Sequence, residues 1–529
     1  MTNTAPTTAT PASPLPEHVR VAVVGSGFAG IGTAVALKRE GIDDFVLLER
    51  AETVGGTWRD NTYPGCACDV PSHLYSFSFA PNPDWSHVFS RQPEIRAYLE
   101  KVTDDFGVRA HLHVSTDLVS GVWDDTALLW RLETSRGPLT ADVVVSGCGG
   151  LVEPHLPEVP GVELFTGPAF HSARWNHDVD LAGKRIAVIG TGASAIQFVP
   201  EIQKTAGSVV VFQRTPPWIV PRHDRVISDK ERALFRRVPA AQAAARNGIY
   251  WLRELNLLSF TRGGPLRAAA TKEATKNLEG AISDPDLRAK LTPDYEIGCK
   301  RVLLSNDYYP ALAQPNVEVV TTGVTEVRAH SVVDGDGVEH DVDVIVYGTG
   351  FRVMDIPVAH RLTGREGRTL SEEWAGSGAE AHRGTTVAGF PNLYLLLGPN
   401  TALGHSSVVF MIEAQIAYVM AALLSAGTLG ARAVEVRRGA QDTYNRALQE
   451  QLDTTVWNQG GCRAWYRDAN GKNFTLWPTH TFTFRKQTSR FDAESYELRV
   501  PAGPPAPSVS QVPVSQVLVS QASVSQVSA

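Results

Sequence analysis

Cysteines, basic residues and long apolar runs are all scarce in this chain of 529 residues, and each scarcity excludes a class of protein. Only five cysteines occur and none forms a CxxC pair, so neither a disulfide-rich secreted fold nor a metal site is predicted. The 49 Lys and Arg are outnumbered by 56 Asp and Glu, and the resulting net charge of −7 argues against a nucleic-acid partner. No run approaches eighteen apolar residues, so no membrane span is expected.

The N-terminus also lacks features of a secreted protein. Its first nineteen residues contain no Lys or Arg and no apolar core, which argues against a secretory signal. We therefore expect a cytoplasmic protein with reduced cysteines. Residues 1–18 are rich in Thr, Ala and Pro, and residues 501–529 repeat Ser-Gln every five positions without a single charge. The composition predicts a disordered arm and a low-complexity disordered tail.

The chain does contain two glycine-rich turns, each placed between an apolar strand and a helix. The first lies in RVAVVGSGFAGIGTAVALKREG and has the pattern G-x-G-x-x-G, and the next strand ends in an acid about twenty residues on. Such glycines let the backbone approach a pyrophosphate at a helix N-terminus. The acid would accept ribose hydroxyls and repel a 2′-phosphate, so FAD or NAD(H) is expected here. The predicted contacts are Gly25, Gly27, Phe28, Ala29, Gly30 and Glu49.

The segment after the second strand, GGTWRDNTYPGCACD, favours a flavin, because its paired glycines bring more backbone near a dinucleotide. Cys66 and Cys68 are interpreted as small buried residues of a tight loop. Asp69 is an acid in an otherwise uncharged stretch, and we expect it to have a specific partner. The aromatic residues that follow are expected in the core or in a pocket wall. The further predicted cofactor contacts are Gly56, Thr57, Trp58, Asp69 and Tyr75.

The second glycine-rich turn, in KRIAVIGTGASAIQFV, has the pattern G-x-G-x-x-A. The strand after it, SVVVFQR, ends without an acid, and Arg214 stands where Glu49 stands in the first unit. A guanidinium at this position suits a 2′-phosphate, so NADP(H) is predicted. The residues expected to contact it are Gly190, Thr191, Gly192, Ser194, Ala195, Arg214 and Thr215.

The predicted fold is α/β, with two Rossmann-like dinucleotide-binding domains and a helical insertion in the second. Residues 226–296 have a helical period and are rich in Ala, Lys, Arg and Glu, and apolar strands return after them. We expect residues 19–154 and 376–500 to form the FAD-binding domain. The NADP-binding domain is expected to comprise residues 155–225 and 297–375.

An FAD site beside an NADP(H) site implies hydride transfer from nicotinamide to flavin. A disulfide reductase would need a CxxC or CxxxxC pair near the flavin, and the sequence has none. A reductase that feeds an external carrier and an oxygen-using enzyme both remain open at this point.

Two motifs narrow this choice. Phe165, Gly167, His171 and Trp175 form F-x-G-x-x-x-H-x-x-x-W, which resembles the fingerprint of Baeyer–Villiger monooxygenases. Sister N- and S-oxygenases usually carry Tyr at the tryptophan. The family pattern usually continues with Pro or Asp, where this chain has Asn176. A second family pattern, G-G-x-W-x-x-x-x-Y-P-G-x-x-x-D, is met in full by residues 55–69, and the resemblance extends over residues 19–495.

The resemblance implies an NADPH- and O2-dependent flavin monooxygenase of the EC 1.14.13 type. Through a C4a-peroxyflavin it would insert one oxygen atom next to the carbonyl of a small ketone, giving an ester or lactone. Arg301 matches the arginine that stabilises developing negative charge, and Asp69 matches the carboxylate that orients it. Lys300 matches a second 2′-phosphate ligand, and Trp465 matches a tryptophan that hydrogen-bonds NADP. The His171 motif matches a linker whose position follows NADP(H) binding.

Two alternatives remain. An N- or S-hydroxylating flavin monooxygenase would need no Arg301. An NADPH oxidase or flavin reductase would have no organic oxygen acceptor.

Overall fold

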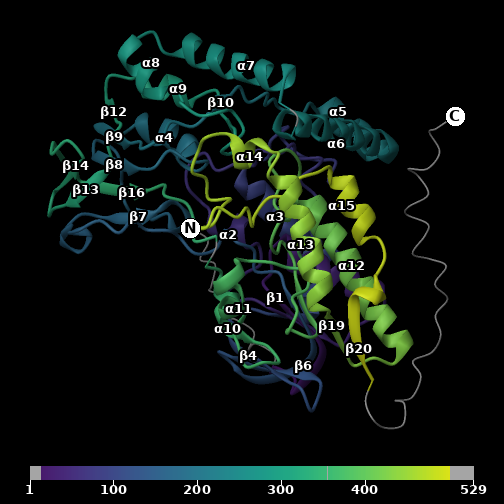
Figure 1. Ribbon diagram of the computed structural model, residues 1–529. Coiled ribbons are helices and arrows are strands. Elements are labelled where there is room, and N and C mark those ends of the chain that lie inside the picture. Colours follow the sequence, from purple (N-terminus) through teal and green to yellow (C-terminus); the bar gives the residue numbers. More distant parts are fainter. Residues whose placement is uncertain (1–13, 262, 354, 501–529) are drawn as a thin grey trace, which may run out of the picture.

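The computed structural model describes residues 14–261, 263–353 and 355–500. The two segments predicted to be disordered lie outside this part of the chain, apart from residues 14–18, where the first strand begins at His18. The rest folds into two lobes, each built on its own sheet (Figure 1).

The first lobe is organised around an eight-stranded sheet in the order β17-β4-β5-β6-β1-β2-β3, with β18 also paired with β6. β1 pairs in parallel with β2 and β6, whereas β4, β5 and β6 form an antiparallel meander. Residues 21–24 of the central strand β1 are buried, as their apolar run predicts. The strands are β1 (His18–Val24), β2 (Phe45–Leu48), β3 (Leu112–His113), β4 (Leu118–Asp124), β5 (Leu129–Thr134), β6 (Gly137–Ser146), β17 (Leu362–Thr363) and β18 (Leu393–Leu395).

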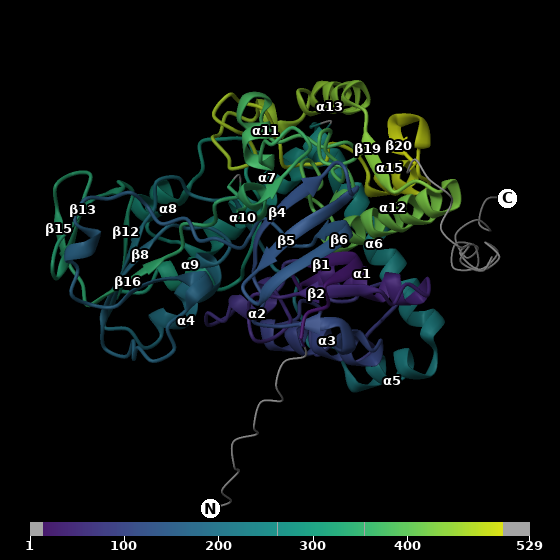
Figure 2. The same cartoon turned by 90° about the horizontal axis from the view of Figure 1, so that it is seen from below.

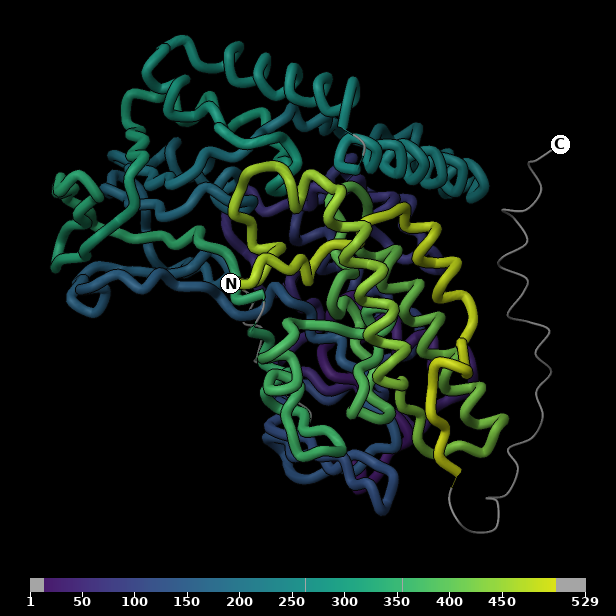
Figure 3. The backbone as a smooth tube through the Cα atoms, viewed as in Figure 1, coloured from purple at the N-terminus to yellow at the C-terminus, as the bar shows by residue number. Residues whose placement is uncertain are grey.

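The first and last parts of the chain share this lobe, as the tube in Figure 3 shows. α1 packs side by side with the long α12, which in turn packs against α15 (Figure 2). A small antiparallel pair, β19 and β20, completes the C-terminal part. The elements are α1 (Phe28–Arg39), α2 (Thr57–Asp60), α3 (Gln92–Asp105), α10 (Pro357–Arg361), α11 (Leu370–Ser377), α12 (Val408–Leu429), α13 (Arg438–Leu452), α14 (Val456–Gln459), α15 (Thr481–Thr488), β19 (Ala433–Val436) and β20 (Tyr496–Arg499).

α12 has the length and composition of a membrane span. The sequence analysis expected no span, because this helix contains no uninterrupted run of eighteen apolar residues. Most of its apolar window is buried inside the protein, where it packs against α1 and α15. A core helix of a large domain passes the same test of length and hydropathy, and α12 has the burial of such a helix.

The second lobe contains a five-stranded parallel sheet in the order β12-β9-β8-β16-β7. A three-stranded antiparallel sheet, β13-β14-β15, extends it. The elements are β7 (Ala169–His171), β8 (Arg185–Ile189), α4 (Ala195–Gln203), β9 (Ser208–Phe212), α9 (Tyr308–Leu312), β12 (Val317–Val320), β13 (Val324–Val327), β14 (Ser331–Asp334), β15 (Glu339–Asp341) and β16 (Val344–Tyr347). Together the two lobes confirm the predicted α/β fold with two dinucleotide-binding units.

Helices fill the predicted insertion. They are α5 (Asp229–Arg237), α6 (Pro239–Thr261), α7 (Pro265–Ala281) and α8 (Pro285–Leu291). The hydroxyl of Ser228 caps α5 by accepting a hydrogen bond from the amide of Glu231, and prolines begin α7 and α8. A parallel two-residue pair, β10 (Ile219–Val220) and β11 (Leu303–Leu304), brackets the insertion and returns the chain to the second lobe.

The chain re-enters the first sheet earlier than the predicted boundary at residue 376. Leu362 in β17 pairs with Gly121 in β4, and Leu362 and Leu370 belong to the core beneath the first sheet. The chain therefore crosses between the sheets after β16 and before β17. The short β17 contains no glycine-rich or apolar run from which the sequence could have predicted it.

Candidate active site

The first glycine turn brings two backbone segments unusually close. Gly25 has φ +93°, and a Cβ on Gly30 would lie 1.7 Å from the carbonyl oxygen of Gly25. A Cβ on Gly56 would lie 3.1 Å from the Cα of Gly27, at the N-terminal end of α1. The free amides of the first turn of α1, which begins at Phe28, suit an anion such as a diphosphate. The turn therefore fits the dinucleotide predicted for it.

Glu49, predicted to bind ribose, is buried and already has several protein partners. One carboxylate oxygen accepts hydrogen bonds from the amide (3.0 Å) and hydroxyl (2.6 Å) of Ser26. The other accepts from the amide of Ala51 (2.9 Å) and lies 2.9 Å from the Arg59 guanidinium. These four donors match the capacity of a carboxylate, so a ribose hydroxyl at Glu49 would have to displace one of them.

The aromatic residues predicted near the flavin form one cluster beside this turn. The indole of Trp58, in α2, donates a hydrogen bond to the Tyr75 hydroxyl at 3.1 Å. The Tyr75 ring lies 5.1 Å from the ring of Phe28, which starts α1. Thr57 begins α2 directly after Gly56, whose φ is +52°. The predicted contacts from three segments therefore converge on the N-terminus of α1.

The second turn repeats this geometry. Gly190 has φ +105°, and a Cβ there would lie 2.5 Å from the carbonyl oxygen of Gly348, just after β16. A Cβ on Gly192 would meet only that oxygen, at 3.9 Å, so space remains open above it. Ala195 begins α4, and the side chain of Ser194 makes no capping hydrogen bond. This glycine-lined space at a helix N-terminus fits a second diphosphate.

Two cations lie near each other beyond the second turn. Arg214 is exposed after β9, followed by Thr215, and the ammonium of Lys300 lies 5.0 Å from the ring centre of Tyr295. Burial lowers the pKa of Lys300 and the nearby Arg214 lowers it further, while Asp294 opposes them. Adjacent cations repel each other, and an anion bound between them relieves this repulsion. Two neighbouring cations therefore suit a 2′-phosphate.

Arg301 and Asp69 are directly paired across the two lobes. The guanidinium donates to one carboxylate oxygen of Asp69 from Nε (2.9 Å) and Nη2 (2.5 Å), and Nη1 lies 3.4 Å from the carbonyl oxygen of Leu403. Asp69 raises the pKa of Arg301. Burial works against the charge on Asp69, but Arg301 outweighs it and holds the pKa of this carboxyl below its usual range. The side chains remain 34% and 30% exposed, so a fixed cation is accessible to a ligand.

Two residues that the sequence did not single out hold the Asp69 loop in place. Gln197, in α4, accepts hydrogen bonds from the Tyr63 hydroxyl (3.0 Å) and the Ala67 amide (3.2 Å), and donates to the Ala67 carbonyl (3.0 Å). Arg222 donates to the carbonyl of Cys68 at 3.0 Å. These contacts join segments more than 100 residues apart, so no local sequence pattern predicts them.

Two further side chains surround the ion pair. Arg253, in α6, is partly buried and lies within electrostatic range of both Asp69 and Arg301. Burial raises the pKa of Tyr466 to about 12, against an opposing effect of Arg301. The helical insertion and the segment after α14 thus both contribute to this site.

The fingerprint stretch belongs to the second sheet. His171 ends β7, which pairs with β16 at the sheet edge, and its Nδ1 accepts a hydrogen bond from the Ala173 amide (3.1 Å). Burial lowers the pKa of His171 to about 4, so the ring is neutral near pH 7. Trp175 packs on Phe198 of α4, with ring centres 5.4 Å apart. Gly167 is tightly enclosed, since a Cβ there would lie 2.4 Å from the Asp343 carbonyl oxygen and 2.9 Å from the Phe165 ring.

The expectation that all cysteines are reduced is wrong for two of the five. Cys299 and Cys462 form a disulfide. Their separation of 163 residues left no spacing signal in the sequence. Cys66 and Cys68 are free and buried, as interpreted, and burial raises the pKa of Cys66 to about 11. The described part of the chain contains no cluster of His, Cys, Asp or Glu able to hold a metal ion.

Comparisons with known proteins agree with this arrangement. Residues 18–238 match the model of the flavin-binding monooxygenase-like family. A Baeyer–Villiger monooxygenase of Streptomyces coelicolor is 55% identical over 92% of this chain and 94% of its own length. One from Pseudomonas aeruginosa is 50% identical over 91% and 92%.

Solved structures show the same fold. Cyclohexanone monooxygenase from Rhodococcus sp. Phi1 bound to NADP+ matches 92% of this chain and all of its own, with a TM-score of 0.81 and 28% identity. Oxidised steroid monooxygenase bound to NADP matches 91% of this chain and 99% of its own, with a TM-score of 0.80 and 30% identity. The chain belongs to the Baeyer–Villiger monooxygenases, within the flavin-binding monooxygenase-like family.

Proposed function

We propose that this enzyme uses NADPH and O2 to convert a ketone into an ester or lactone. When bound, FAD and NADPH supply hydride transfer and the activation of oxygen. The glycine turn between β1 and α1 would hold FAD, with Trp58 and Tyr75 beside it. The turn between β8 and α4 would hold NADP(H), with Arg214 and Lys300 on its 2′-phosphate.

The corresponding domain division is also a proposal. We assign residues 19–154 to FAD together with the C-terminal part from β17 onwards, and the second sheet to NADP(H). Residues 226–296 form an insertion between them. We further propose a cytoplasmic location.

The observation that carries the function is the Arg301–Asp69 pair. Oxygen insertion beside a carbonyl builds negative charge on the reacting oxygen atoms, and a preorganised cation lowers the energy of that state. Arginine stays charged throughout and offers several donors. Asp69 takes Nε and Nη2, which fixes the guanidinium plane and leaves Nη1, 3.4 Å from the Leu403 carbonyl, with the weakest restraint. We propose that Nη1 faces the substrate.

The pair also separates this function from N- or S-hydroxylation, which needs no such cation. The substrate class is consistent with the same chemistry, since the carbonyl carbon of a ketone accepts an attacking anion and passes the charge to its oxygen. One structural relative, cyclohexanone monooxygenase, has a cyclic ketone in its name. We propose a ketone as the substrate here.

The test replaces Arg301 with Met, which keeps the length of the side chain and removes its charge. Ester or lactone formation should fall at least about 10²- to 10³-fold, as for loss of a donor to a developing oxyanion. NADPH oxidation should continue and release hydrogen peroxide. Arg237→Met, at an exposed position of α5, should leave both rates unchanged.

Labelled oxygen provides the second arm. With 18O2, one labelled atom should appear in the ester or lactone made by the unmodified enzyme. Peroxide as the sole labelled product across aliphatic, cyclic and aryl ketones would instead identify an NADPH oxidase. Undiminished ester formation by Arg301→Met would refute the role of this residue.

A further inference from the structure

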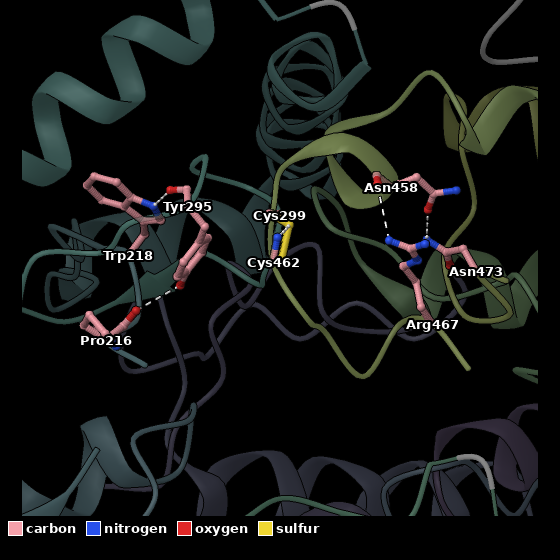
Figure 4. Close-up of a disulfide and its surroundings, with 8 residues drawn as sticks. All are labelled: Pro216, Trp218, Tyr295, Cys299, Asn458, Cys462, Arg467 and Asn473. Atoms are coloured by element: carbon pink, nitrogen blue, oxygen red, sulfur yellow. Dashed lines mark hydrogen bonds between the residues drawn. A yellow bond between two sulfur atoms is a disulfide. The ribbon is translucent and has the colours of Figure 1, made fainter. Parts of the chain in front are cut away.

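Figure 4 shows the Cys299–Cys462 disulfide. It joins the segment that carries Arg301 to the segment that carries Trp465. Cys299 stands directly before Lys300 and Arg301, and Cys462 stands three residues before Trp465. Neither segment has regular secondary structure at the bridge, since β11 begins at Leu303 and α15 at Thr481. The bridge therefore links two loops on which the proposed NADP(H) and substrate contacts depend.

The Cys299 side is anchored to the second lobe. The indole of Trp218 donates a hydrogen bond to the Tyr295 carbonyl at 2.8 Å, and the Tyr295 hydroxyl donates to the Pro216 carbonyl at 3.0 Å (Figure 4). Both partners lie between β9 and the β10–β11 pair. Lys300 packs on the same Tyr295 ring. This half of the bridge is therefore held in place whether or not the disulfide is closed.

The Cys462 side is anchored to the first lobe on both sides of the bridge, since Val456 and Trp457 of α14 are buried in the core before it and Tyr466 is buried after it. Arg467 Nη1 donates to the Asn458 carbonyl at 3.3 Å, and Asn473 Nδ2 donates to the Asn458 side-chain oxygen at 3.2 Å (Figure 4). Asn400, just after β18, donates to the Asn473 carbonyl at 2.7 Å. The disulfide is thus a covalent link between the lobes.

The two loops share a small buried core, which includes Tyr295, Cys299 and Tyr466, but few hydrogen bonds join them. Within the described residues, two hydrogen bonds join residues 460–465 to residues 294–301: the Glu296 amide donates to the Gly460 carbonyl (3.1 Å), and the Cys462 amide lies 3.3 Å from Cys299 Sγ. The second of these depends on the position of the sulfur itself. Trp465 itself is 47% exposed, between Ala464, which packs on the core, and the buried Tyr466. Opening the bridge would remove the covalent restraint on residues 461–465, which lie between the buried Trp457 and Tyr466.

We propose, on the basis of the proposed function, that Cys299 and Cys462 are positioning residues for NADP(H) binding and that their disulfide is a redox switch. When closed, the bridge holds the Trp465 loop against the Lys300–Arg301 segment, so binding requires little further ordering. When the bridge is open, NADP(H) must order the loop as it binds, and this entropic cost weakens its affinity. Intracellular disulfides are commonly redox-sensing, which is consistent with this role.

The switch is a thiol–disulfide exchange with a dithiol reductant. A thiolate of the reductant attacks the sulfur of Cys462, a partly exposed residue, whereas the residue Cys299 is only 1% exposed. The S–S bond breaks, Cys299 leaves as a thiolate and takes up a proton, and a mixed disulfide forms on Cys462. The second thiol of the reductant then releases Cys462 as a thiol. Two electrons and two protons pass from the dithiol to the protein, and a small disulfide reverses the exchange.

The experiment compares the FAD-loaded wild-type enzyme after treatment with oxidised or reduced dithiothreitol, each then removed by gel filtration. Thiol titration of the denatured protein should count three thiols in the oxidised form and five in the reduced form, matching three free cysteines and one bridge. The dissociation constant of NADP+ and the KM for NADPH should rise on the order of five- to tenfold on reduction. The rate of flavin reduction at saturating NADPH should change less than twofold, a split that general damage to the fold would not produce.

Variants separate the bridge from the other thiols. Cys462→Ser should show the raised constants and no further response to dithiothreitol, while Cys148→Ser should keep the wild-type response. Trypsin should cut after the exposed Arg463 faster in the reduced enzyme than in the oxidised one. The wild-type comparison needs no variant, so it decides the question even if Cys462→Ser does not fold.

Two results would overturn the proposal: five thiols after oxidising treatment, or equal NADP+ affinities in the three-thiol and five-thiol forms. A lack of ester formation in both forms would count against the proposed function alone, because NADP+ affinity is measured without turnover.

Discussion

Single side chains decide cofactor choice at the second nucleotide turn. Arg214 is exposed at the end of β9, with Lys300 within electrostatic range, so a 2′-phosphate would replace their mutual repulsion with charge-assisted hydrogen bonds. We predict that Arg214→Ala raises the KM for NADPH roughly ten- to hundredfold, since a hydrogen bond to a charged group contributes about 1.5–3 kcal/mol. NADH, which lacks this phosphate, is the matched control and should show little change. Steady-state kinetics with both coenzymes test this, and an equal loss with NADH would refute it.

His171 makes the stability of the protein depend on pH. Burial lowers its folded-state pKa to about 4, below the value of about 6.5 in an unfolded chain. The unfolded state therefore binds more protons between these values, and stability falls as the pH drops through this window. Between pH 7 and pH 5 this residue alone should remove about 2 kcal/mol from the free energy of unfolding.

The variant His171→Asn tests this effect, because its side chain can still accept the Ala173 amide but cannot ionise. Denaturant unfolding at the two pH values should show the smaller loss in the variant. The exposed His223→Asn should retain the wild-type pH dependence. If His171→Asn loses as much stability as the wild type, the ring is not the titrating group.

At the scale of elements, the loop from Tyr63 to Asp69 and helix α4 depend on one glycine. Gly65 has φ +79°, and a Cβ there would lie 2.6 Å from the carbonyl oxygen of Gln197. Gly41 has a similar φ of +70° with nothing within 4 Å of its Cβ position, so it isolates the cost of the backbone conformation. We predict that Gly65→Ala costs about 1–3 kcal/mol more than Gly41→Ala, as overpacking does. Denaturant unfolding of both variants measures the difference.

The displaced loop would also carry Asp69 away from Arg301. Gly65→Ala should therefore lower ester formation more than NADPH oxidation, whereas Gly41→Ala should affect neither. Equal stability of the two variants would mean that α4 moves to accept the methyl group at no cost.

The elements differ in how far the sequence predicts them. Both glycine turns were predicted, because an apolar strand, a glycine-rich turn and a helix follow one another directly in the chain. Such a pattern can be recognised within a short stretch of sequence. The short β17 was not predicted, since two residues carry no periodicity. Gln197, Arg222 and Arg253 were missed because their partners depend on how the lobes pack. Arg301 and Asp69 are 232 residues apart, and only the family resemblance brought them together in advance.

At the scale of the whole molecule, the lobes and the insertion act as one unit around the ion pair. One hydrophobic core runs from Val23 and Ile31 in the first lobe through Phe198 to Val188 in the second sheet. The insertion shares this core through Leu278 and Leu291, and the buried carboxylate of Glu254 in α6 adds a polar connection.

Glu254 joins the insertion to the C-terminal part of the first lobe. Its oxygens accept hydrogen bonds from the Thr481 amide (3.0 Å) and hydroxyl (2.6 Å), and lie 3.2 Å from His480 and 3.5 Å from His405. His405 is two residues from Leu403, whose carbonyl faces Arg301. Movement of α6 is thereby connected to the position of the catalytic cation proposed here.

We predict that Glu254→Ala loosens the insertion, because it leaves buried donors without an acceptor, and each such group costs about 1–3 kcal/mol. Hydrogen exchange of the α6 amides should accelerate by at least tenfold, with β1 amides unchanged. More NADPH should be spent on hydrogen peroxide, since Arg301 would be less well fixed. Glu279→Ala, at an exposed position of α7, should alter neither quantity. If α6 exchange stayed slow while peroxide release rose, Glu254 would act on the site without holding the insertion, and the connection through α6 would be refuted.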